Sequence, residues 1–483
     1  MDKIDKAKSI CKKLQNHGFV AGFVGGAVRD TFLGKEPHDY DIVTSAKPEQ
    51  IKELFKNDND LKAIEVGETF GIVSMWSKKC GCAFEVATFR TDGVYTDGRR
   101  PDSVEFTDDV VVDLSRRDFT VNAMFLDPVS GELIDPFDGR KDIENKKIRF
   151  VGDAYYRIDE DRLRILRAYR FCAKLGFELS TEADRDICNL MVMNGVEPLR
   201  GVSQERIVDE FEKILLTGHD CVSKALAPMA RNGLLWLVIP ELKAQLRDHD
   251  SKWHIETFED FGTAIISHTF RVVQNAGLTI LGHDLLHPDQ LMAREDKLRL
   301  MWAALLHDVG KPNVAAPNKS GRTCYHKHEL VGSEMALEIL TRMRLPNKRV
   351  AAVASLVRWH MSIHDLPSMK NVASIRKLLG RDDIWLLLNL GFADTAATEN
   401  EESDLSSRGK DGVKILKDVV KRWVENFPEM LPQPIVTGDD LIAAGLKPSP
   451  SFKKALEIAY DEQLRGTINK VKLLNHAVAC VSQ

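Results

Sequence analysis

The chain has 483 residues, of which 43% are hydrophobic and 29% are charged, and its formal net charge is −5. This length predicts about three domains, and the composition excludes disordered and fibrous proteins. The mild negative charge argues against a protein coated in basic charge, so any contact with RNA would have to be local.

Short apolar or alternating stretches, separated by turn residues, dominate the first 150 residues and predict strands at 19–22, 39–43, 71–75 and 82–89. Beyond residue 155, helical periods follow one another at 160–175, 181–193, 203–216, 223–230, 296–306, 332–343 and 348–360. The predicted fold class is α+β, with a small mixed sheet and its helices at 1–150 and all-α regions at 151–250, 251–400 and 401–483. We expect the polar stretch 397–412 to be an exposed linker.

The chain shows no sign of a membrane or an oxidising environment. No apolar run approaches the roughly 20 residues that a membrane helix needs, and the N-terminal sequence lacks the apolar core of a signal peptide. The eight cysteines are scattered, and Cys80-Gly81-Cys82 has no second pair that would complete a zinc site. This pattern is typical of a reduced protein without a disulfide framework, so we expect a cytoplasmic protein without membrane contacts.

The first functional pattern is a glycine pair, Gly25-Gly26, between a predicted strand and a predicted helix. The glycines let the backbone turn sharply beside a ligand, the start of the helix favours phosphate, and Arg29 adds a charged fork. Asp39 and Asp41 follow, and on one strand their carboxylates would point to the same face. Because neighbouring carboxylates repel each other, the pair indicates a bound cation such as Mg²⁺.

The sequence Gly-Gly-x-Val-Arg-Asp-x-x-Leu-Gly, followed by Asp-x-Asp, resembles the signature of class II tRNA nucleotidyltransferases and bacterial poly(A) polymerases. These enzymes belong to the DNA polymerase β-type nucleotidyltransferase superfamily. The resemblance implies a catalytic head at 1–150 in which Asp39 and Asp41 bind Mg²⁺. Glu85, on a neighbouring predicted strand, is either a third catalytic carboxylate or an exposed strand position. The residues of this segment that the resemblance places at the nucleotide are Gly25, Gly26, Arg29 and Asp30.

Residues 90–106 are rich in Gly, Asp and Arg, which predicts a mobile surface loop. The resemblance implies a flexible loop that helps to reshape the site between addition of C and addition of A. The charged residues that we assign to this loop are Arg90, Asp92 and Arg99.

Residues 116–124 are similar to the family's Arg-Arg-Asp-Phe-Thr-x-Asn-Ala motif. By itself the segment would be interpreted as a capped helix with a charged first turn. The resemblance implies that Asp118 accepts a hydrogen bond from the ribose 2′-OH, which selects ribonucleotides because a deoxy analogue leaves a polar group unpaired. The nucleotide-binding residues expected here are Arg116, Arg117, Asp118 and Asn122.

Glu160, Asp161 and Arg164 can share one face of the helix predicted over 160–175. A solvated salt-bridge ladder is the plain structural interpretation. Asp161, however, offers only acceptors and Arg164 only donors, so together they match the Watson–Crick edge of cytosine and, after a small rearrangement, of adenine. The segment resembles the family's Glu-Asp-x-x-Arg motif, in which protein side chains serve as the template.

A basic strip near this motif is expected to contact nucleotide or tRNA phosphates, which reconciles RNA binding with the acidic total. The candidates are Arg157, Arg164, Arg167, Arg170 and Arg200. The helix over 203–216 resembles the one that buttresses the neck in the family, and we assign it a mainly structural role.

The second half of the chain carries an independent set of histidines and aspartates, in the order His268, His307-Asp308, His328, His360 and Asp394. Their order resembles that of the HD superfamily of metal-dependent phosphohydrolases, and such ligands suit Ni²⁺, Mn²⁺, Co²⁺ or Zn²⁺. A degenerate HD fold with idle histidines is the alternative. His326 is a possible substitute for His328, and His364 is among the histidines that carry no pattern. The expected ligands are His268, His307, Asp308, His328, His360 and Asp394.

The sequence therefore predicts an enzyme that adds CCA to tRNA 3′ ends with CTP and ATP, with a second phosphohydrolase activity (phosphatase or 2′,3′-cyclic phosphodiesterase) possible at the HD site. A poly(A) polymerase, or an enzyme that adds only A or only CC, is the nearest alternative. A phosphohydrolase whose N-terminal half only binds RNA is an alternative of another class. The expected partners are tRNA, CTP and ATP.

Overall fold

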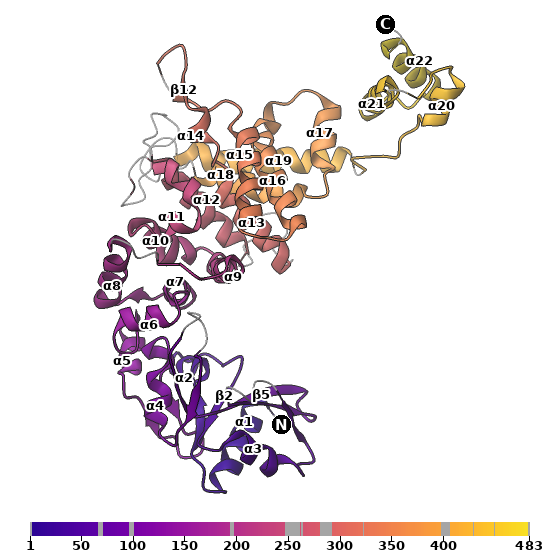
Figure 1. The fold of residues 1–483 in the computed structure, drawn as a ribbon. Helices are drawn as coiled ribbons and strands as arrows, with labels where there is room; N and C mark the ends of the chain where they lie inside the picture. Colours follow the sequence, from indigo (N-terminus) through magenta and orange to yellow (C-terminus); the bar gives the residue numbers. More distant parts are fainter. Residues whose placement is uncertain are drawn as a thin grey trace. The chain divides into compact units, whose positions relative to one another are not determined.

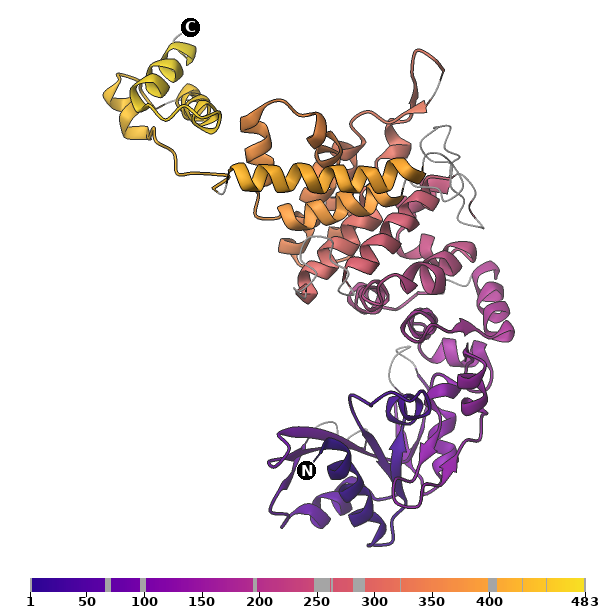
Figure 2. The same cartoon turned by 180° about the vertical axis from the view of Figure 1, so that it is seen from behind.

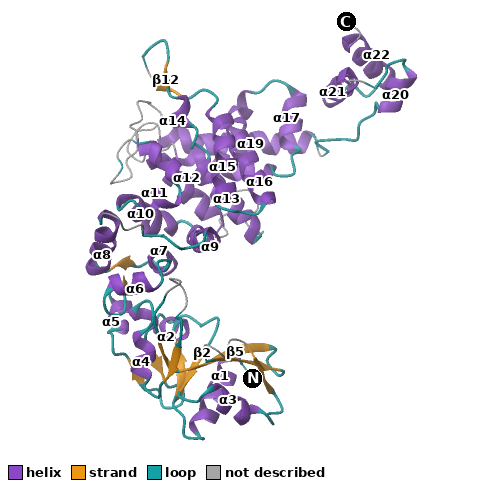
Figure 3. Cartoon of the chain, viewed as in Figure 1, coloured by secondary structure: helices purple, strands orange, loops and turns teal. Residues whose placement is uncertain are grey.

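We describe the protein from a computed structural model, in which the chain divides into two compact units, Met1–Pro240 and Glu241–Gln483 (Figure 1). The described residues are 2–65, 71–95, 101–193, 198–246, 261, 264–280, 292–321, 323–397, 406–427, 429–448 and 450–481. Strands are concentrated in unit 1, and unit 2 is almost entirely helical (Figure 3). This distribution confirms the predicted fold class. The finer division at residues 150, 250 and 400 stays a prediction.

The centre of unit 1 is a seven-stranded sheet in the order β3-β4-β5-β2-β1-β8-β9. β2 and β5 pair in parallel, whereas the other neighbours pair antiparallel, so the sheet is mixed as predicted. The strands are β1 (Ala21–Val24), β2 (Asp41–Thr44), β3 (Leu61–Glu65), β4 (Ile72–Ser77), β5 (Cys82–Thr88), β8 (Phe125–Leu126) and β9 (Leu133–Ile134). A separate two-stranded ribbon joins β6 (Arg90–Asp92) to β7 (Val104–Phe106).

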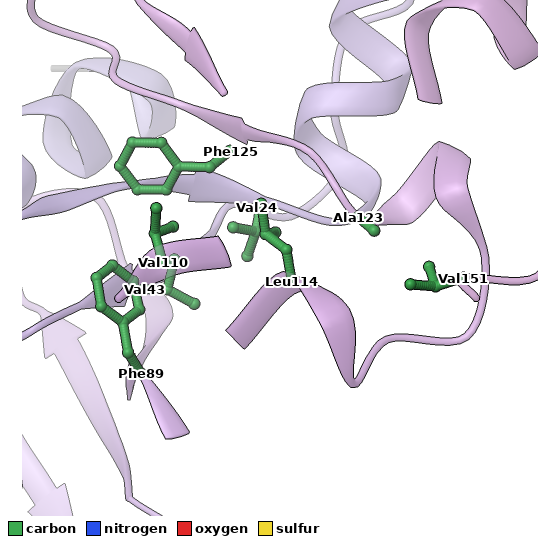
Figure 4. Close-up of a cluster of buried hydrophobic side chains, with 8 residues drawn as sticks. All are labelled: Val24, Val43, Phe89, Val110, Leu114, Ala123, Phe125 and Val151. Atoms are coloured by element: carbon green, nitrogen blue, oxygen red, sulfur yellow. The ribbon is translucent and has the colours of Figure 1, made fainter. Parts of the chain in front are cut away.

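Short helices accompany the sheet, and a buried cluster of Val, Leu and Phe side chains joins β1 and β2 to α4 (Figure 4). A methyl group at Gly22 in β1 would lie 2.5 Å from the Phe125 ring, so only glycine lets this ring pack against the strand. The helices are α1 (Lys3–Gln15), α2 (Gly26–Phe32), α3 (Pro48–Phe55), α4 (Val110–Ser115), the 3₁₀ turn η2 (Thr120–Asn122) and α5 (Gly139–Glu144).

The helix predicted over 160–175 begins only at Arg164, as α7 (Arg164–Leu175), and Glu160 is the last residue of a separate helix, α6 (Ala154–Glu160). The backbone of Asp161 is extended, and its carboxylate accepts a hydrogen bond from the Leu163 N–H at 3.1 Å. An aspartate that satisfies a free N–H just before a helix competes with continued helix formation. The break therefore arises from Asp161 itself.

The rest of unit 1 is built from short helices and one parallel strand pair. These elements are β10 (Lys147–Ile148), β11 (Glu178–Leu179), α8 (Thr181–Val192), α9 (Gln204–Leu215), the π-helical turn η3 (Val222–Leu226), α10 (Ala227–Arg231) and α11 (Leu234–Val238).

Unit 2 is a helical bundle in which α15 packs on α16 and α12 packs on α18. Figure 2 shows α19 lying along α18. Because α19 begins at residue 406, the linker predicted over 397–412 is wrong for its second half. The elements are η4 (Pro240–Leu246), α12 (Ile265–Ile280), α13 (Arg294–Leu306), α14 (Lys311–Val314), β12 (Ala316–Pro317), β13 (Thr323–Cys324), α15 (His328–Arg342), α16 (Asn347–Asp365), η5 (Leu366–Ser368), α17 (Val372–Leu379), α18 (Ile384–Ala397) and α19 (Ser406–Asn426).

The last helices of unit 2 pack around a small core of their own. They are α20 (Gly438–Ala443), α21 (Pro450–Leu464) and α22 (Lys470–Val481). The buried Arg376 of α17 donates hydrogen bonds to the main-chain oxygens of Glu429, Met430 and Leu464, at 2.8 to 3.0 Å. This one side chain therefore ties the C-terminal helices to α17.

Two observations bear on the cysteine and membrane predictions. Cys80 and Cys82 form a disulfide across the turn between β4 and β5, so the prediction of an entirely reduced protein is wrong at this position. Gly81 adopts a positive φ of 63°, which lets the chain reverse within three residues and brings the two sulfurs together. In the part of the chain that the structure describes, no helix is long and apolar enough to cross a membrane.

Candidate functional site

The first candidate site lies where β1, β2 and β5 run side by side. Val24 pairs with Asp41 across β1 and β2, and Gly25 follows with a φ of 66° that favours glycine. In the parallel pair of β2 and β5, Ile42 is opposite Val86, so the preceding residues, Asp41 and Glu85, are neighbours. Both side chains remain accessible. The structure thus brings Asp41 and Glu85 together at the strand edge beside the glycine turn.

Asp39 is placed differently from the expectation that it shares a strand face with Asp41, because β2 begins only at Asp41. Its carboxylate accepts from Lys3 Nζ at 2.7 Å and contacts His38 Nδ1 at 2.8 Å, and these bonds lower its pKa. Partial desolvation and the charge of Asp39 raise the pKa of Asp41, which Arg117 opposes. The negative charges of Asp39 and Asp41 thus repel each other. Within the described residues of unit 1, however, no three candidate ligand atoms come as close together as in a closed metal site.

Arg29 is not an open phosphate fork. It is 3% exposed, its Nη1 donates to Asn122 Oδ1 at 2.6 Å, and its Nη2 lies 2.8 Å from Asp30 Oδ1. Asn122 in turn donates to Asp118 Oδ1 at 3.1 Å. The glycine-turn motif and the Arg-Arg-Asp motif are therefore joined through side chains, a link that the spacing of the sequence could not show.

Asp118 is held as a carboxylate by Arg167 of α7. Arg167 Nε lies 3.1 Å and Nη2 2.5 Å from Asp118 Oδ2, and the Phe119 N–H donates to Oδ1 at 2.8 Å. Burial disfavours the charged form, but the Arg167 charge outweighs it and keeps the pKa of Asp118 below its usual value. Arg167 therefore faces the carboxylate predicted to contact the ribose.

The base of the predicted flexible loop is held by an alternating row of charges. Arg90 Nε lies 3.0 Å from Asp92, which also accepts from the Tyr95 hydroxyl at 2.7 Å. Arg116 lies between Asp92 and Asp113, at 3.6 and 2.7 Å, and Arg117 Nη2 is 3.3 Å from Asp113. Arg99 lies outside the described residues.

The predicted template residues have partners of their own. Arg206 Nη2 of α9 donates to both oxygens of Asp161, at 3.0 and 2.8 Å. Arg164, which is 9% exposed, donates to Glu160 Oε2 at 2.5 Å and to the main-chain oxygen of Arg157 at 2.8 Å. Glu160 at the end of α6 and Arg164 at the start of α7 therefore form a charged pair across the break. Asp161, within the break, is paired with α9. Sequence reasoning missed the contact of Arg206, because no local spacing links α9 to Asp161.

The second candidate site is a buried cluster in unit 2, where α12, α13, α15, α16 and α18 meet (Figure 1). Six residues form this cluster, and each of them is at most 6% exposed. They form two triads whose ligand atoms lie within 4.8 Å of one another: His268, His307 and Asp394, and Asp308, His328 and His360. The structure thus brings together all six residues that the sequence analysis selected as ligands.

The histidine rings are fixed so that their lone pairs face inward. Nδ1 of His307, His328 and His360 lies 2.7 to 2.8 Å from the main-chain oxygen three residues earlier. Since a carbonyl oxygen only accepts, each Nδ1 carries a proton, and in the neutral form of each ring Nε2 then presents a lone pair. The two Nε2 atoms of His328 and His360 are only 3.2 Å apart. Burial lowers the pKa of His360 to about 3, so the His360 ring is neutral at neutral pH. A cation bound between the two Nε2 atoms would relieve their repulsion.

Asp308 connects the two triads. Its Oδ2 lies 3.1 Å from His307 Nε2 and its Oδ1 lies 3.2 Å from His328 Nε2. Lys311 Nζ, which the sequence analysis did not select, is 2.6 Å from Oδ2. Buried His307 Nε2 makes no hydrogen bond of good geometry, as expected of a ligand atom that awaits a metal. The donor set of neutral imidazoles and carboxylates fits a divalent cation, whose identity the geometry does not fix.

Two other histidines differ from expectation. His326 is exposed and is not part of either triad, so the suggestion that it substitutes for His328 is wrong. His364, which carried no recognised pattern, lies 2.7 Å from Asp394 Oδ2 through its Nε2. The signal that could have found it is its place one helical turn after His360 on α16.

Comparisons with known proteins agree with this geometry. Family models match residues 21–149 as a poly A polymerase head domain, 196–246 as a probable RNA and SrmB-binding site of polymerase A, and 265–384 as an HD domain. The first candidate site lies on strands inside the first match. Residues 21–149 of unit 1 are therefore similar to a poly A polymerase head domain. The two triads, apart from Asp394, lie within the HD domain match, so the resemblance to nucleotidyltransferases of this type with an HD domain is confirmed.

The chain is also similar to individual proteins. It is 40% identical over 275 residues to a CCA-adding enzyme of Lactococcus lactis subsp. lactis, a match that covers 54% of this chain and 64% of that protein. A crystal structure of the Bacillus stearothermophilus CCA-adding enzyme in complex with CTP matches with 26% identity and a TM-score of 0.60, covering 99% and 98% of the two chains. The Thermotoga maritima CCA-adding enzyme complexed with tRNA matches with 17% identity, a TM-score of 0.60 and coverage of 100% and 96%, which shows the shared fold. By sequence, the chain spans less than two thirds of the length of its curated relatives.

Proposed function

We propose that this protein adds C, C and A to the 3′ end of tRNA, using CTP and ATP and releasing pyrophosphate. The observation that carries the proposal is the 40% identity to a CCA-adding enzyme, in a chain whose head places Asp41 and Glu85 beside the glycine turn. The tRNA 3′-OH would attack the α-phosphate of the bound nucleotide. The partners are therefore tRNA, CTP and ATP, and we propose that the protein acts in the cytoplasm.

Asp39, Asp41 and Glu85 would hold Mg²⁺, which activates the attacking hydroxyl and stabilises the departing pyrophosphate. Gly25 leaves room beside them, because a Cβ atom there would lie 3.5 Å from both Asp41 Oδ2 and Arg117 Nη1. Arg117 is well placed to neutralise a triphosphate in that space. Asp118, kept charged by Arg167, would accept the hydrogen bond of the ribose 2′-OH.

Asp161 and Arg164 would select the base. Asp161 can accept from an exocyclic amino group and Arg164 can donate to ring acceptors, the order that cytosine and adenine offer. In the absence of nucleotide these groups are paired with Arg206 and Glu160, so neither is left as a buried unpaired charge. Binding of a base would then exchange one set of partners for another, with little net change in charge.

We further propose that unit 2 has metal-dependent phosphohydrolase activity, as a phosphatase or a 2′,3′-cyclic phosphodiesterase. The triads would bind Ni²⁺, Mn²⁺, Co²⁺ or Zn²⁺, which supplies an activated water for attack on a phosphoester. Lys311, beside Asp308, would neutralise part of the phosphate charge.

The decisive experiment incubates the protein with tRNA that ends before CCA, offering each nucleoside triphosphate singly and in pairs. We expect a product ladder of two steps with CTP alone and a third step when ATP is added. Continuous addition of A, or failure to use CTP, would instead identify a poly(A) polymerase or an A-adding enzyme. Absence of any incorporation beside phosphohydrolase activity would identify an HD enzyme with an RNA-binding N-terminal half.

A further inference from the structure

We infer that His364 is a positioning residue of the unit 2 metal centre, which it serves by holding Asp394 in a one-oxygen binding mode. The inference rests on the proposed metal-dependent function of this cluster. It starts from the helix that carries the residue. His360 and His364 are four residues apart on α16, so they project from the same face. His360 belongs to the triad of Asp308, whereas His364 contacts the other triad through Asp394.

The two oxygens of Asp394 have separate roles in this arrangement. Oδ1 lies 2.9 Å from His268 Nε2 and 4.0 Å from His307 Nε2, so it faces the ligand atoms of its own triad. Oδ2 is the oxygen that contacts His364, whose Nε2 lies 2.7 Å away. A carboxylate whose second oxygen is held by a hydrogen bond presents a single oxygen to a metal. His364 therefore fixes both the rotation of the carboxylate and its number of ligand atoms.

The position of His364 also differs from that of the six ligands. Its side chain is 27% exposed, whereas that of Asp394 is 9% exposed, so His364 lies on the solvent side of the carboxylate. It belongs to neither triad, and its Nε2 is occupied by Asp394. These facts separate His364 from the six candidate ligands and point to orientation of Asp394 as its role.

The test compares three variants of the full chain, stripped with a chelator and titrated with Mn²⁺. His364→Leu removes the hydrogen bond, and we expect Mn²⁺ affinity to fall about 10- to 100-fold. His364→Gln keeps a nitrogen donor near the Nε2 position, and we expect affinity within about threefold of wild type. His326→Ala alters an exposed histidine of the same unit and should bind like wild type.

A spectroscopic readout separates this role from a merely structural one. With Co²⁺ in place of Mn²⁺, the His364→Leu protein should show a changed d–d absorption spectrum, because Asp394 is free to bind through both oxygens. CCA addition by all three variants should equal that of wild type. If the wild-type protein binds metal and His364→Leu has the same affinity and spectrum, the positioning role of His364 is overturned, while the phosphohydrolase proposal stands. If wild type binds no metal, the phosphohydrolase proposal is overturned with it.

Discussion

The two candidate sites balance their charges in opposite ways. In unit 1, two of the carboxylates assigned to metal or base binding are already paired with cations of the chain, Asp39 with Lys3 and Asp161 with Arg206. In unit 2, imidazole lone pairs and carboxylates converge with two Nε2 atoms only 3.2 Å apart. These two carboxylates would have to exchange partners to bind a ligand, whereas in unit 2 a cation would relieve the contact between the Nε2 atoms of His328 and His360. A buried set of repelling acceptors is thus the stronger structural indication of a metal.

The largest effect should follow from Asp41→Asn, which keeps the size of the side chain but removes its charge. We expect CCA addition to fall by a factor on the order of 10³, because the cation that stabilises the leaving group loses a ligand. Initial rates of CTP incorporation into tRNA measure the change. Mn²⁺ uptake by unit 2 serves as the control and should stay at the wild-type level. Addition at near wild-type rate would contradict the assignment of Asp41.

His307→Ala tests the opposite half of the comparison. Removing one ligand from a preassembled triad should lower metal affinity at least about 100-fold and abolish phosphohydrolase turnover. CCA addition should persist, because the two candidate sites lie in separate compact units. Metal content per chain after dialysis is the measurement, and His476→Ala, an exposed histidine of unit 2, is the matched control. A parallel loss of addition would show that the two sites are not independent.

Arg206→Ala asks how far the head relies on pairs within the chain. Asp161 would lose both hydrogen bonds to α9. Because hydrogen bonds between charged groups are strong, we expect the KM for CTP and for ATP to rise about tenfold. The kcat should change less, because the reacting groups are untouched. Arg185→Ala is the control, since that side chain is 66% exposed on α8. An unchanged KM would mean that Arg206 only supports the fold.

The smallest effect is expected for the double substitution Cys80→Ser and Cys82→Ser. The disulfide closes a loop of only three residues, so its loss should lower the free energy of unfolding by less than about 2 kcal/mol. Denaturant titration of the oxidised wild type, the reduced wild type and the variant would measure it. Addition activity should be the same in all three, and a clear loss of activity would tie the β4–β5 turn to the nucleotide site.

The sequence predicted the parts of this molecule that depend on local pattern. Alternation and turn residues identified four strands of the mixed sheet, and the order of histidines and aspartates identified all six members of the two triads. These residues could be found because each lies in a motif whose residue types are scarce and whose chemistry is specific. Whether they bind metal and nucleotide stays a prediction.

The features that the sequence did not reveal depend on contacts between distant segments. Arg206 reaches Asp161 from 45 residues away, and His364 reaches Asp394 from 30 residues away. The helix break at Asp161 was missed for a different reason, since periodicity continues through it while a side chain satisfies the backbone instead. Propensity and spacing cannot register a carboxylate that competes with its own helix.

The attachment of the C-terminal helices has an evolutionary consequence. Arg376 grips main-chain oxygens, which every residue possesses, so the side chains of Glu429, Met430 and Leu464 are free to vary without weakening these three bonds. Arg376 has no such freedom, because only a planar guanidinium presents three donors in a fixed fork. Among related sequences, we therefore expect the arginine on α17 to stay constant while the residues that accept its hydrogen bonds vary. The module beyond it could be remodelled or exchanged while its connection to the bundle stayed the same.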